Sequence, residues 1–236
     1  MKLLFENWRG YLLSESYILD EDFFEASIQQ LFDKLKDFGD NTWIFFDTET
    51  TRFEPVADAQ LTEIAAVAAY PNNWQFEEVE AEKGLFYDKI KLNPETIAGW
   101  EASDNPKAKE ALGLTRYGMK GAEYREKYPK GMPDEVDVIK EFLVYVKNQP
   151  NPVLVAQNAE FDINFVETRA NFHRTRILEE LRLKELEREE LPTDAIEDEI
   201  QHLEDTISVL GVNLRNYPIF DTMMLIKLWH NSLIKT

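Results

Sequence analysis

The sequence predicts an α/β domain in which helices flank a mixed β-sheet. Short apolar runs, which are typical of strands buried on both faces, occur at residues 43–46 and 153–156, and residues 219–222 predict a last strand. Between these runs lie segments whose apolar residues recur every three or four positions, as in amphipathic helices. The predicted order is three strands, a helix, a strand, a helical excursion, a strand and a helix. This alternation favours a layered α/β architecture with helices over both faces of the sheet.

The N-terminal part of the chain supplies one predicted helical segment and three predicted strands. Residues 1–40 carry apolar side chains at helical spacing and contain Gly39 as a stop, so we expect a helix on the outside of the domain. Residues 43–46 form the first predicted strand. Residues 61–70 are rich in Ile, Val and Ala, and residues 85–92 alternate apolar and polar side chains, so both segments predict further strands.

The central and C-terminal segments alternate between helix and strand. Pro133 opens a predicted helix, which the proline-rich residues 149–152 end before the strand at 153–156. A helical pattern begins at about Asp162. After the strand at 219–222, a last helix is predicted from Met223 onward.

Residues 177–210 are predicted to form an inserted acidic helical hairpin that Pro192 divides. Twelve acidic residues and three basic residues lie between positions 179 and 205. The second half ends at Gly211 and carries apolar residues at heptad-like spacing. This seam consists of Ile196, Ile200, Leu203, Ile207 and Leu210. Two interpretations stay open: a solvated insertion, or an arm that binds a partner protein or a second copy of the chain, because an exposed heptad seam packs against another helix.

The composition limits the classes of function. The chain has 236 residues, 44% of them apolar, which suits one domain with a sizeable core. It contains no cysteine, which excludes disulfides, zinc–thiolate sites and cysteine nucleophiles. Its net charge of −19 opposes binding to nucleic acid unless a bound divalent cation reverses the local field. Without a signal peptide or an apolar run of membrane-span length, we expect a cytoplasmic protein with no membrane partner.

The first chemically informative motif is Phe-Asp-Thr-Glu-Thr-Thr, which begins at Phe46. Side chains alternate along a strand, so Asp47 and Glu49 point to the same face. Two carboxylates at the end of a buried strand repel each other unless a cation lies between them. Hard oxygen ligands of this kind suit Mg²⁺ or Mn²⁺. Taken alone, an Asp-x-Glu tripeptide is equally consistent with an ordinary polar strand end.

The second motif is Asn-Ala-Glu-Phe-Asp, which runs from Asn158 to Asp162 immediately after an apolar strand. It places Asp162 in the first turn of the next predicted helix. A single acid at this position can be an ordinary N-terminal charge, worth about 0.3–1 kcal/mol. The presence of Asn158 and Phe161 at fixed spacing after a strand favours a functional site.

In this order the two motifs resemble the first and second exonuclease motifs of the DEDD (DnaQ-like) 3′→5′ exonuclease superfamily, whose fold is ribonuclease H-like. Residues 61–67 resemble the second strand of that family, and residues 219–225 resemble its Asp-Thr strand. The resemblance covers about residues 42–175 and 215–236. It implies that residues 1–236 form a single exonuclease domain.

The resemblance also implies roles for individual residues. Asp47, Glu49 and Asp162 would be the catalytic carboxylates that bind two Mg²⁺ or Mn²⁺ ions, and the ions would clamp the scissile phosphate. The residues expected to contact the substrate or support the site are Thr48, Thr50, Leu61 and Asn158.

The family requires a fourth carboxylate, for which Tyr217-x-x-x-Asp221 is a literal match. That motif works on a helix, where residues four apart share a face. Pro218 and the apolar residues after it predict a strand instead, so Asp221 is expected on or beside the last strand, near the metal site but outside the fourth ligand position. The helix from Met223 leaves no room for another motif before Thr236. The fourth ligand is therefore expected beyond this sequence or in an unconventional place, or the domain is impaired.

The sequence thus predicts a metal-dependent exonuclease that removes nucleotides from single-stranded DNA. Two alternatives are an RNA exonuclease and a catalytically weak replication or repair scaffold that binds a partner through residues 177–210. Basic residues in the loop region are candidates for phosphate contacts, although scattered solubilising charge is an equal explanation. These are Arg116, Lys120, Arg125, Lys127 and Lys130.

Overall fold

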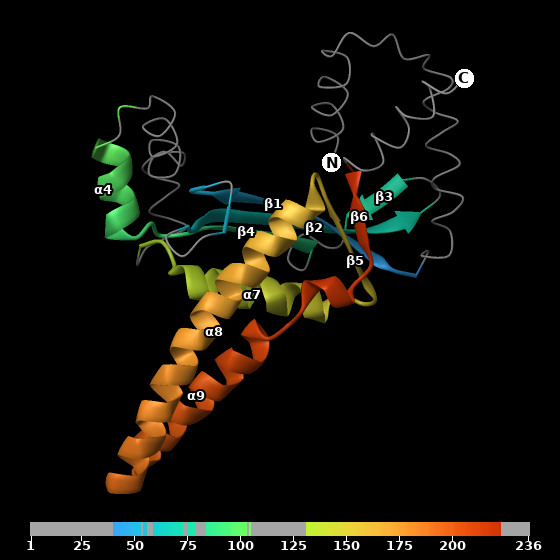
Figure 1. The fold of residues 1–236 in the computed structure, drawn as a ribbon. Coiled ribbons are helices and arrows are strands. Elements are labelled where there is room, and N and C mark those ends of the chain that lie inside the picture. Colours follow the sequence, from blue (N-terminus) through green and yellow to red (C-terminus); the bar gives the residue numbers. More distant parts are fainter. Residues whose placement is uncertain are drawn as a thin grey trace, which may run out of the picture.

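The computed structural model describes residues 40–52, 54–55, 59–72, 75–78, 84–102, 104 and 131–222 (Figure 1). Almost all of the predicted N-terminal segment 1–40 lies outside these ranges, as do the helix predicted from Met223 and the basic cluster between Arg116 and Lys130.

The described residues form an α/β structure around one mixed six-stranded sheet. Its strands are β1 (Thr42–Thr50), β2 (Leu61–Asn72), β3 (Gln75–Glu78), β4 (Leu85–Lys89), β5 (Pro152–Ala156) and β6 (Ile219–Asp221). The strand order is β3-β2-β1-β5-β6, and β4 pairs with β2. The pairs among β1 to β4 are antiparallel, whereas β5 runs parallel to both β1 and β6. The predicted mixed sheet is therefore confirmed.

Two helices cover one face of the sheet, and their apolar residues form the main core. Helix α7 (Glu135–Asn148) connects β4 to β5 across this face, and helix α8 (Ala159–Glu190) follows β5 (Figure 1). The helices bury Phe142 and Phe165 completely against strand residues such as Ile44. This packing explains the helical spacing of apolar residues that the sequence shows after Pro133. Helix α4 (Pro94–Ala102) follows β4 in the chain.

The opposite face of the sheet has a second, smaller apolar cluster. Trp43, Val153 and Val155 are buried there, and the ring of Phe220 stacks on Trp43 with centroids 5.1 Å apart. This cluster explains why β1 and β5 are apolar on both faces. The helices that the sequence predicts over this face lie outside the described residues.

The acidic region forms a helical hairpin that projects from the sheet (Figure 1). Helix α9 (Asp194–Leu210) begins after Pro192, with the Thr193 hydroxyl accepting a hydrogen bond from the Ile196 N–H. Gly211 caps its end as predicted. None of the described helices is both long enough and apolar enough to cross a membrane.

The structure changes two aspects of the predicted hairpin. Residue 177 lies within the continuous helix α8, so the first arm extends the helix that carries Asp162. The heptad seam of α9 packs along α8 within the hairpin and buries Ile196 and Ile200, so this seam is not an exposed surface. The heptad residues of α9 therefore pack against α8 of the same chain.

Candidate carboxylate site at the end of strand β1

The Asp-x-Glu motif lies where β1 extends past its neighbour β5. The register with β5 ends at Phe45, whereas β1 continues to Thr50 beside β2. Phe46 and Thr48 are buried, whereas Asp47 and Glu49 keep exposed surface on the opposite side of the strand. The predicted placement of the two carboxylates on one face is confirmed.

Asp162 approaches the same strand end from the first turn of α8. Its side chain is only 2% exposed. One carboxylate oxygen, Oδ1, accepts hydrogen bonds from the Thr48 N–H at 3.0 Å and from the Thr48 hydroxyl at 2.6 Å. Thr48 therefore ties Asp162 to the residue between the two acids of β1, although 114 positions separate the two residues in the sequence.

The three carboxylates lie in surroundings that disfavour their charged forms. Burial raises the pKa of Asp162 to about 7, hydrogen bonds from Thr48 oppose this shift, and the negative charge of Asp47 adds to it. Burial also raises the pKa of Asp47, as does the charge of Glu63. The pKa of Glu49 is raised by burial and then by the charges of Asp47 and Glu63. Such a cluster gains stability when a cation joins it.

Two residues in this cluster had no predicted role. Glu63 lies directly opposite Glu49 in the antiparallel pair of β1 and β2. The Lys89 ammonium of β4 lies 2.9 Å from a Glu63 carboxylate oxygen and balances part of the negative charge. Lys89 is only 9% exposed; burial alone would lower its pKa, but the bond to Glu63 raises it overall. The sequence signal for Glu63 is its place in a strand that follows the first motif, but its register against Glu49 emerges only from the fold.

The chemistry of this donor set fits a hard divalent cation. The groups are carboxylates, as Mg²⁺ and Mn²⁺ prefer, and burial, together with neighbouring negative charges, raises their pKa values. Across the described ranges, however, no three acidic or histidine side chains converge closely enough to hold an ion. The Thr48 hydroxyl donates a hydrogen bond to Asp162 Oδ1, which keeps this oxygen directed toward Thr48.

The structure places the remaining predicted site residues at different depths. Asn158 is exposed at the start of α8 in a left-handed conformation, with φ 60°. The Thr50 hydroxyl donates to the Arg52 carbonyl oxygen at 2.6 Å. Thr48 and Leu61 are buried, and the Leu61 N–H donates to Glu135. Asn158 and Thr50 therefore keep solvent-exposed surface, whereas Thr48 and Leu61 do not.

Asp221 lies on the last strand, as predicted. It pairs in register with Ala156 of β5, so it is two strands from β1, or roughly 10 Å at ordinary strand spacing. Its Oδ1 accepts a hydrogen bond from the Asn158 N–H at 3.2 Å. Because β6 is extended, Tyr217 and Asp221 do not share a helix face, and the literal Tyr-x-x-x-Asp match lacks its helical geometry.

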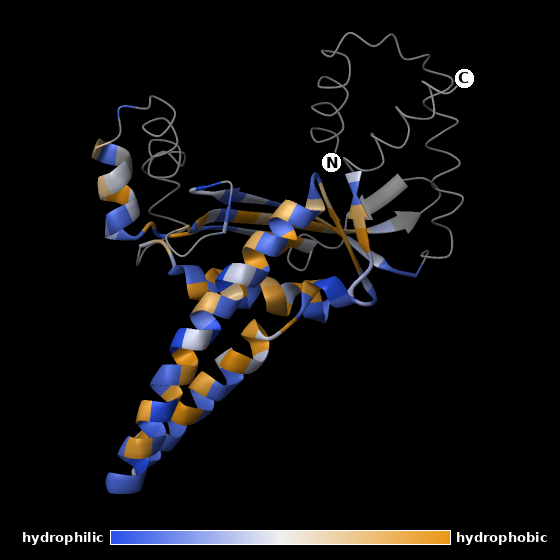
Figure 2. Cartoon of the chain, in the orientation of Figure 1, coloured by the Kyte–Doolittle hydropathy of each residue, from blue (hydrophilic) through white to orange (hydrophobic). Residues whose placement is uncertain are grey.

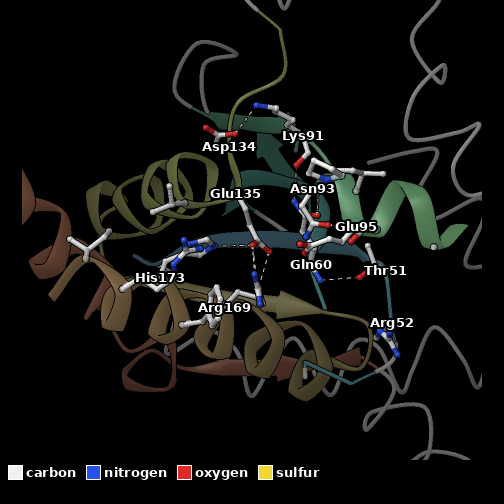
Figure 3. A pocket seen from close by; sticks show the side chains of 18 of the residues that line it. Thr51, Arg52, Gln60, Lys91, Asn93, Glu95, Asp134, Glu135, Arg169 and His173 are labelled. Atoms are coloured by element: carbon white, nitrogen blue, oxygen red, sulfur yellow. Dashed lines mark hydrogen bonds and ion pairs between the residues drawn. The ribbon is translucent and has the colours of Figure 1, made fainter. Parts of the chain in front are cut away.

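A pocket of about 1110 Å³ lies beside the strand end, between the start of β2, helix α4 and helix α8 (Figure 3). Thr51, the last residue of the first motif, and Arg52 contribute to its wall together with Lys91 and Arg176. Acidic residues such as Glu95 and Glu180 also line it, so its charge is mixed.

The wall of this pocket contains a buried ion cluster centred on Glu135 (Figure 3). Arg169 binds the carboxylate through Nε and Nη2, the latter at 2.6 Å, and His173 Nε2 lies 2.8 Å from Oε2. Burial alone would raise the pKa of Glu135, but the bonds from His173 and Arg169 and the charge of Arg169 lower it overall. Because Glu135 also accepts from the Leu61 N–H, it links α7, α8 and β2.

This cluster was not predicted from the sequence. Arg169 and His173 are four positions apart and so share a face of α8, which is the one available signal. Their partner Glu135 lies 34 positions from Arg169, and its role depends on helix packing.

No protein-family model matches this chain, and no curated protein matches it. The resemblance to an exonuclease superfamily therefore rests on the two motifs, together with the strand end that carries them.

Proposed function

We propose that this protein is a metal-dependent 3′→5′ exonuclease of the DEDD (DnaQ-like) type that acts on single-stranded DNA. The observation that carries this proposal is that Asp47 lies close enough to both Glu49 and Asp162 at one strand end for its charge to raise their pKa values, while burial raises the pKa of all three. Carboxylates whose pKa values are raised by burial and by neighbouring like charges cluster at functional sites. The mixed sheet with helices on one face is compatible with the ribonuclease H-like fold that the motifs imply.

On this proposal each residue of the site has a distinct task. Asp47, Glu49 and Asp162 would hold Mg²⁺ or Mn²⁺, with Thr48 setting the position of the Asp162 carboxylate. When bound, such ions stabilise the negative charge that develops on a phosphate undergoing hydrolysis. Asn158 is exposed at the start of α8 and would contact the substrate. Lys89 limits the repulsion within the cluster by pairing with Glu63.

One observation favours a second candidate function, a scaffold with weak or no catalysis. Two hydrogen bonds from Thr48 engage Oδ1 of Asp162, which leaves that oxygen less available to a metal ion. A protein in which this contact persists would bind metal poorly, and its principal role would lie elsewhere in the chain.

The test compares 5′-labelled single strands of DNA and RNA with the same sequence. In Mg²⁺ or Mn²⁺ we expect the DNA to shorten stepwise from its 3′ end, with excess chelator stopping the reaction. A circular single strand is the matched control, because an exonuclease leaves it intact. Faster cleavage of RNA would reassign the substrate, and cleavage in excess chelator would exclude the metal-dependent mechanism. If both labelled strands stay intact under all conditions, the result would favour the scaffold function.

A further inference from the structure

Exposed leucines gather on the acidic hairpin. Eight large apolar side chains are exposed within the described ranges, and four of them fall between residues 178 and 191. They are Leu178, Leu183, Leu186 and Leu191, which are 43%, 66%, 53% and 64% exposed. Single exposed leucines are ordinary, but four within four helical turns form a surface that needs an explanation. Figure 2 shows apolar residues interspersed with hydrophilic ones along both arms of the hairpin.

These leucines are not part of the contact between the two helices of the hairpin. Lys184 bridges to Glu199 of α9 at 2.6 Å, which marks the side of α8 that faces its neighbour. Each residue of an α-helix turns by about 100°, so Leu186 points roughly 160° away from Lys184. Leu178 lies about 80° to one side of Leu186 and Leu183 about 60° to the other, so the three leucines span roughly 140° of the helix surface. We call this side, together with Leu191 at the tip, the outer leucine face.

The charge around the outer leucine face is strongly negative. All twelve acidic residues between positions 179 and 205 are exposed, and only three basic residues accompany them. Two of the three, Lys184 and Arg188, form ion pairs with acids of the hairpin itself. The segment therefore carries a surplus of nine negative charges, nearly half of the net charge of the chain.

This charge decides between the classes of partner that a leucine face can bind. Nucleic acid and membranes rich in anionic lipids would be repelled. A second copy of the chain would bring an equally acidic hairpin against the first, so close pairing of the two faces is opposed as well. A cationic partner is attracted over distances of up to about 10 Å at moderate salt.

We propose that the outer leucine face docks a basic amphipathic helix of a partner protein. The apolar side of the partner helix would cover the leucines, and its lysines and arginines would face the surrounding glutamates. The surface from Leu178 to Leu191 spans roughly 20 Å along the helix, which matches a partner helix of about 14 residues. A surface of this size fits a weak, reversible complex. This docking does not depend on the nuclease activity of the sheet edge.

The test uses synthetic peptides as probes of the full chain. One 18-residue peptide carries leucines at helical spacing among lysines, and a second has the same composition with the leucines distributed around the helix. We expect the first to bind with a micromolar Kd and the second at least about tenfold more weakly. The double variant Leu183→Gln/Leu186→Gln should bind the first peptide at least about tenfold more weakly than the wild type does. The matched control is Leu85→Gln, a leucine that is 60% exposed on β4, which should change nothing.

Three results would overturn the proposal. Equal binding of both peptides would show attraction by charge alone, without a leucine surface. Unchanged affinity in the double variant would place the binding elsewhere on the chain. A wild-type dimer in sedimentation that becomes a monomer in the double variant would assign the face to a second copy of this protein. None of these results bears on cleavage of nucleic acid, which is measured separately.

Discussion

Two acidic regions of this protein differ in how far the fold buries their carboxylates. At the end of β1, Asp162 is 2% exposed and lies near Asp47, whereas every acid between positions 179 and 205 is exposed to water. The first group is small, and burial raises its pKa values. The second group is large, yet water can screen each of its charges. The burial of each carboxylate therefore affects its pKa more than the number of acidic residues in its region does.

A third acid, Glu135, refines this comparison. It is buried like Asp162, but it receives a countercharge from Arg169 at 2.6 Å and its pKa is lowered, not raised. Arg169 thus supplies the positive charge beside Glu135, whereas the charged neighbour of Asp162 is another acid, Asp47. We interpret the first arrangement as structural and the second as a site that awaits a cation.

The largest expected effect is on nuclease activity. Asp47→Ala and Asp162→Ala should each lower the cleavage rate at least about a thousandfold, because each removes a metal-binding oxygen group worth several kcal/mol to the transition state. The melting temperature of Asp47→Ala without metal should hold or rise, because one of several crowded like charges is gone, whereas that of Asp162→Ala should fall because the buried Thr48 donors lose their acceptor. The hairpin variant Glu185→Ala should cleave at the normal rate. Retained activity in the Asp47 variant or the Asp162 variant would contradict the assignment of this site.

The next effect is on stability. Arg169→Met leaves the Glu135 carboxylate buried without its main countercharge, which should lower the free energy of unfolding by about 3–5 kcal/mol. The hairpin offers a matched control, Arg182→Met, because Arg182 is exposed and should change stability by less than about 0.5 kcal/mol. Urea denaturation of the three proteins measures both values. A loss below about 1 kcal/mol for Arg169→Met would show that the cluster is not a structural ion pair.

A smaller effect concerns acid pH. The folded-state pKa of Glu135 lies below its ordinary value of 4.5, so its contribution to stability is present above about pH 4.5 and is lost as the pH falls through the lower folded value. Unfolding measured from pH 6 to pH 3 should show this loss in the wild type. Glu135→Gln should start from a lower stability and show a flatter profile over that range. Parallel profiles for the two proteins would contradict the lowered pKa.

The smallest effect is expected from shortening the hairpin. Replacing residues 183–200 with a short Gly-Ser linker removes exposed acids and the contacts of the hairpin tip, so the rest of the protein should keep its unfolding midpoint and its activity. Removing the whole predicted insertion, 177–210, should be harmful because Ile177, Val209 and Leu210 pack on the main core. Thermal unfolding of both deletions distinguishes these outcomes. If the shorter deletion also unfolds the protein, the tip contributes to the core and the contrast between the two acidic regions fails.

The sequence predicted the parts of the fold that local patterns determine. Apolar runs located β1 and β5, and strand alternation placed Asp47 and Glu49 on one face. Strand β3, with the sequence Gln-Phe-Glu-Glu, was not predicted because it has little of the apolar or β-branched character of a strand. The long helix α8 was divided at residue 177 because its apolar pattern weakens where its charge increases.

The relations between distant residues could not be predicted in the same way. The hydrogen bonds from Thr48 to Asp162 and the contact of Glu135 with His173 join segments that only tertiary packing brings together. The register of Glu63 against Glu49 depends on how β1 and β2 pair. These contacts decide the electrostatics of the site, so the sequence identified the acids without showing what surrounds them.

The most direct test of the central claim is a crystal structure of the protein soaked in Mn²⁺, with the ions located by anomalous scattering. We expect an ion bound by Asp47, Glu49 and Asp162, with the Asp162 carboxylate turned from Thr48 toward it and Asp221 outside the coordination shell. An ion that Asp221 coordinates, with Tyr217 facing its water, would show that the Tyr-x-x-x-Asp match is functional after all. Absence of any ion at this strand end at saturating Mn²⁺ would contradict the proposed metal site itself.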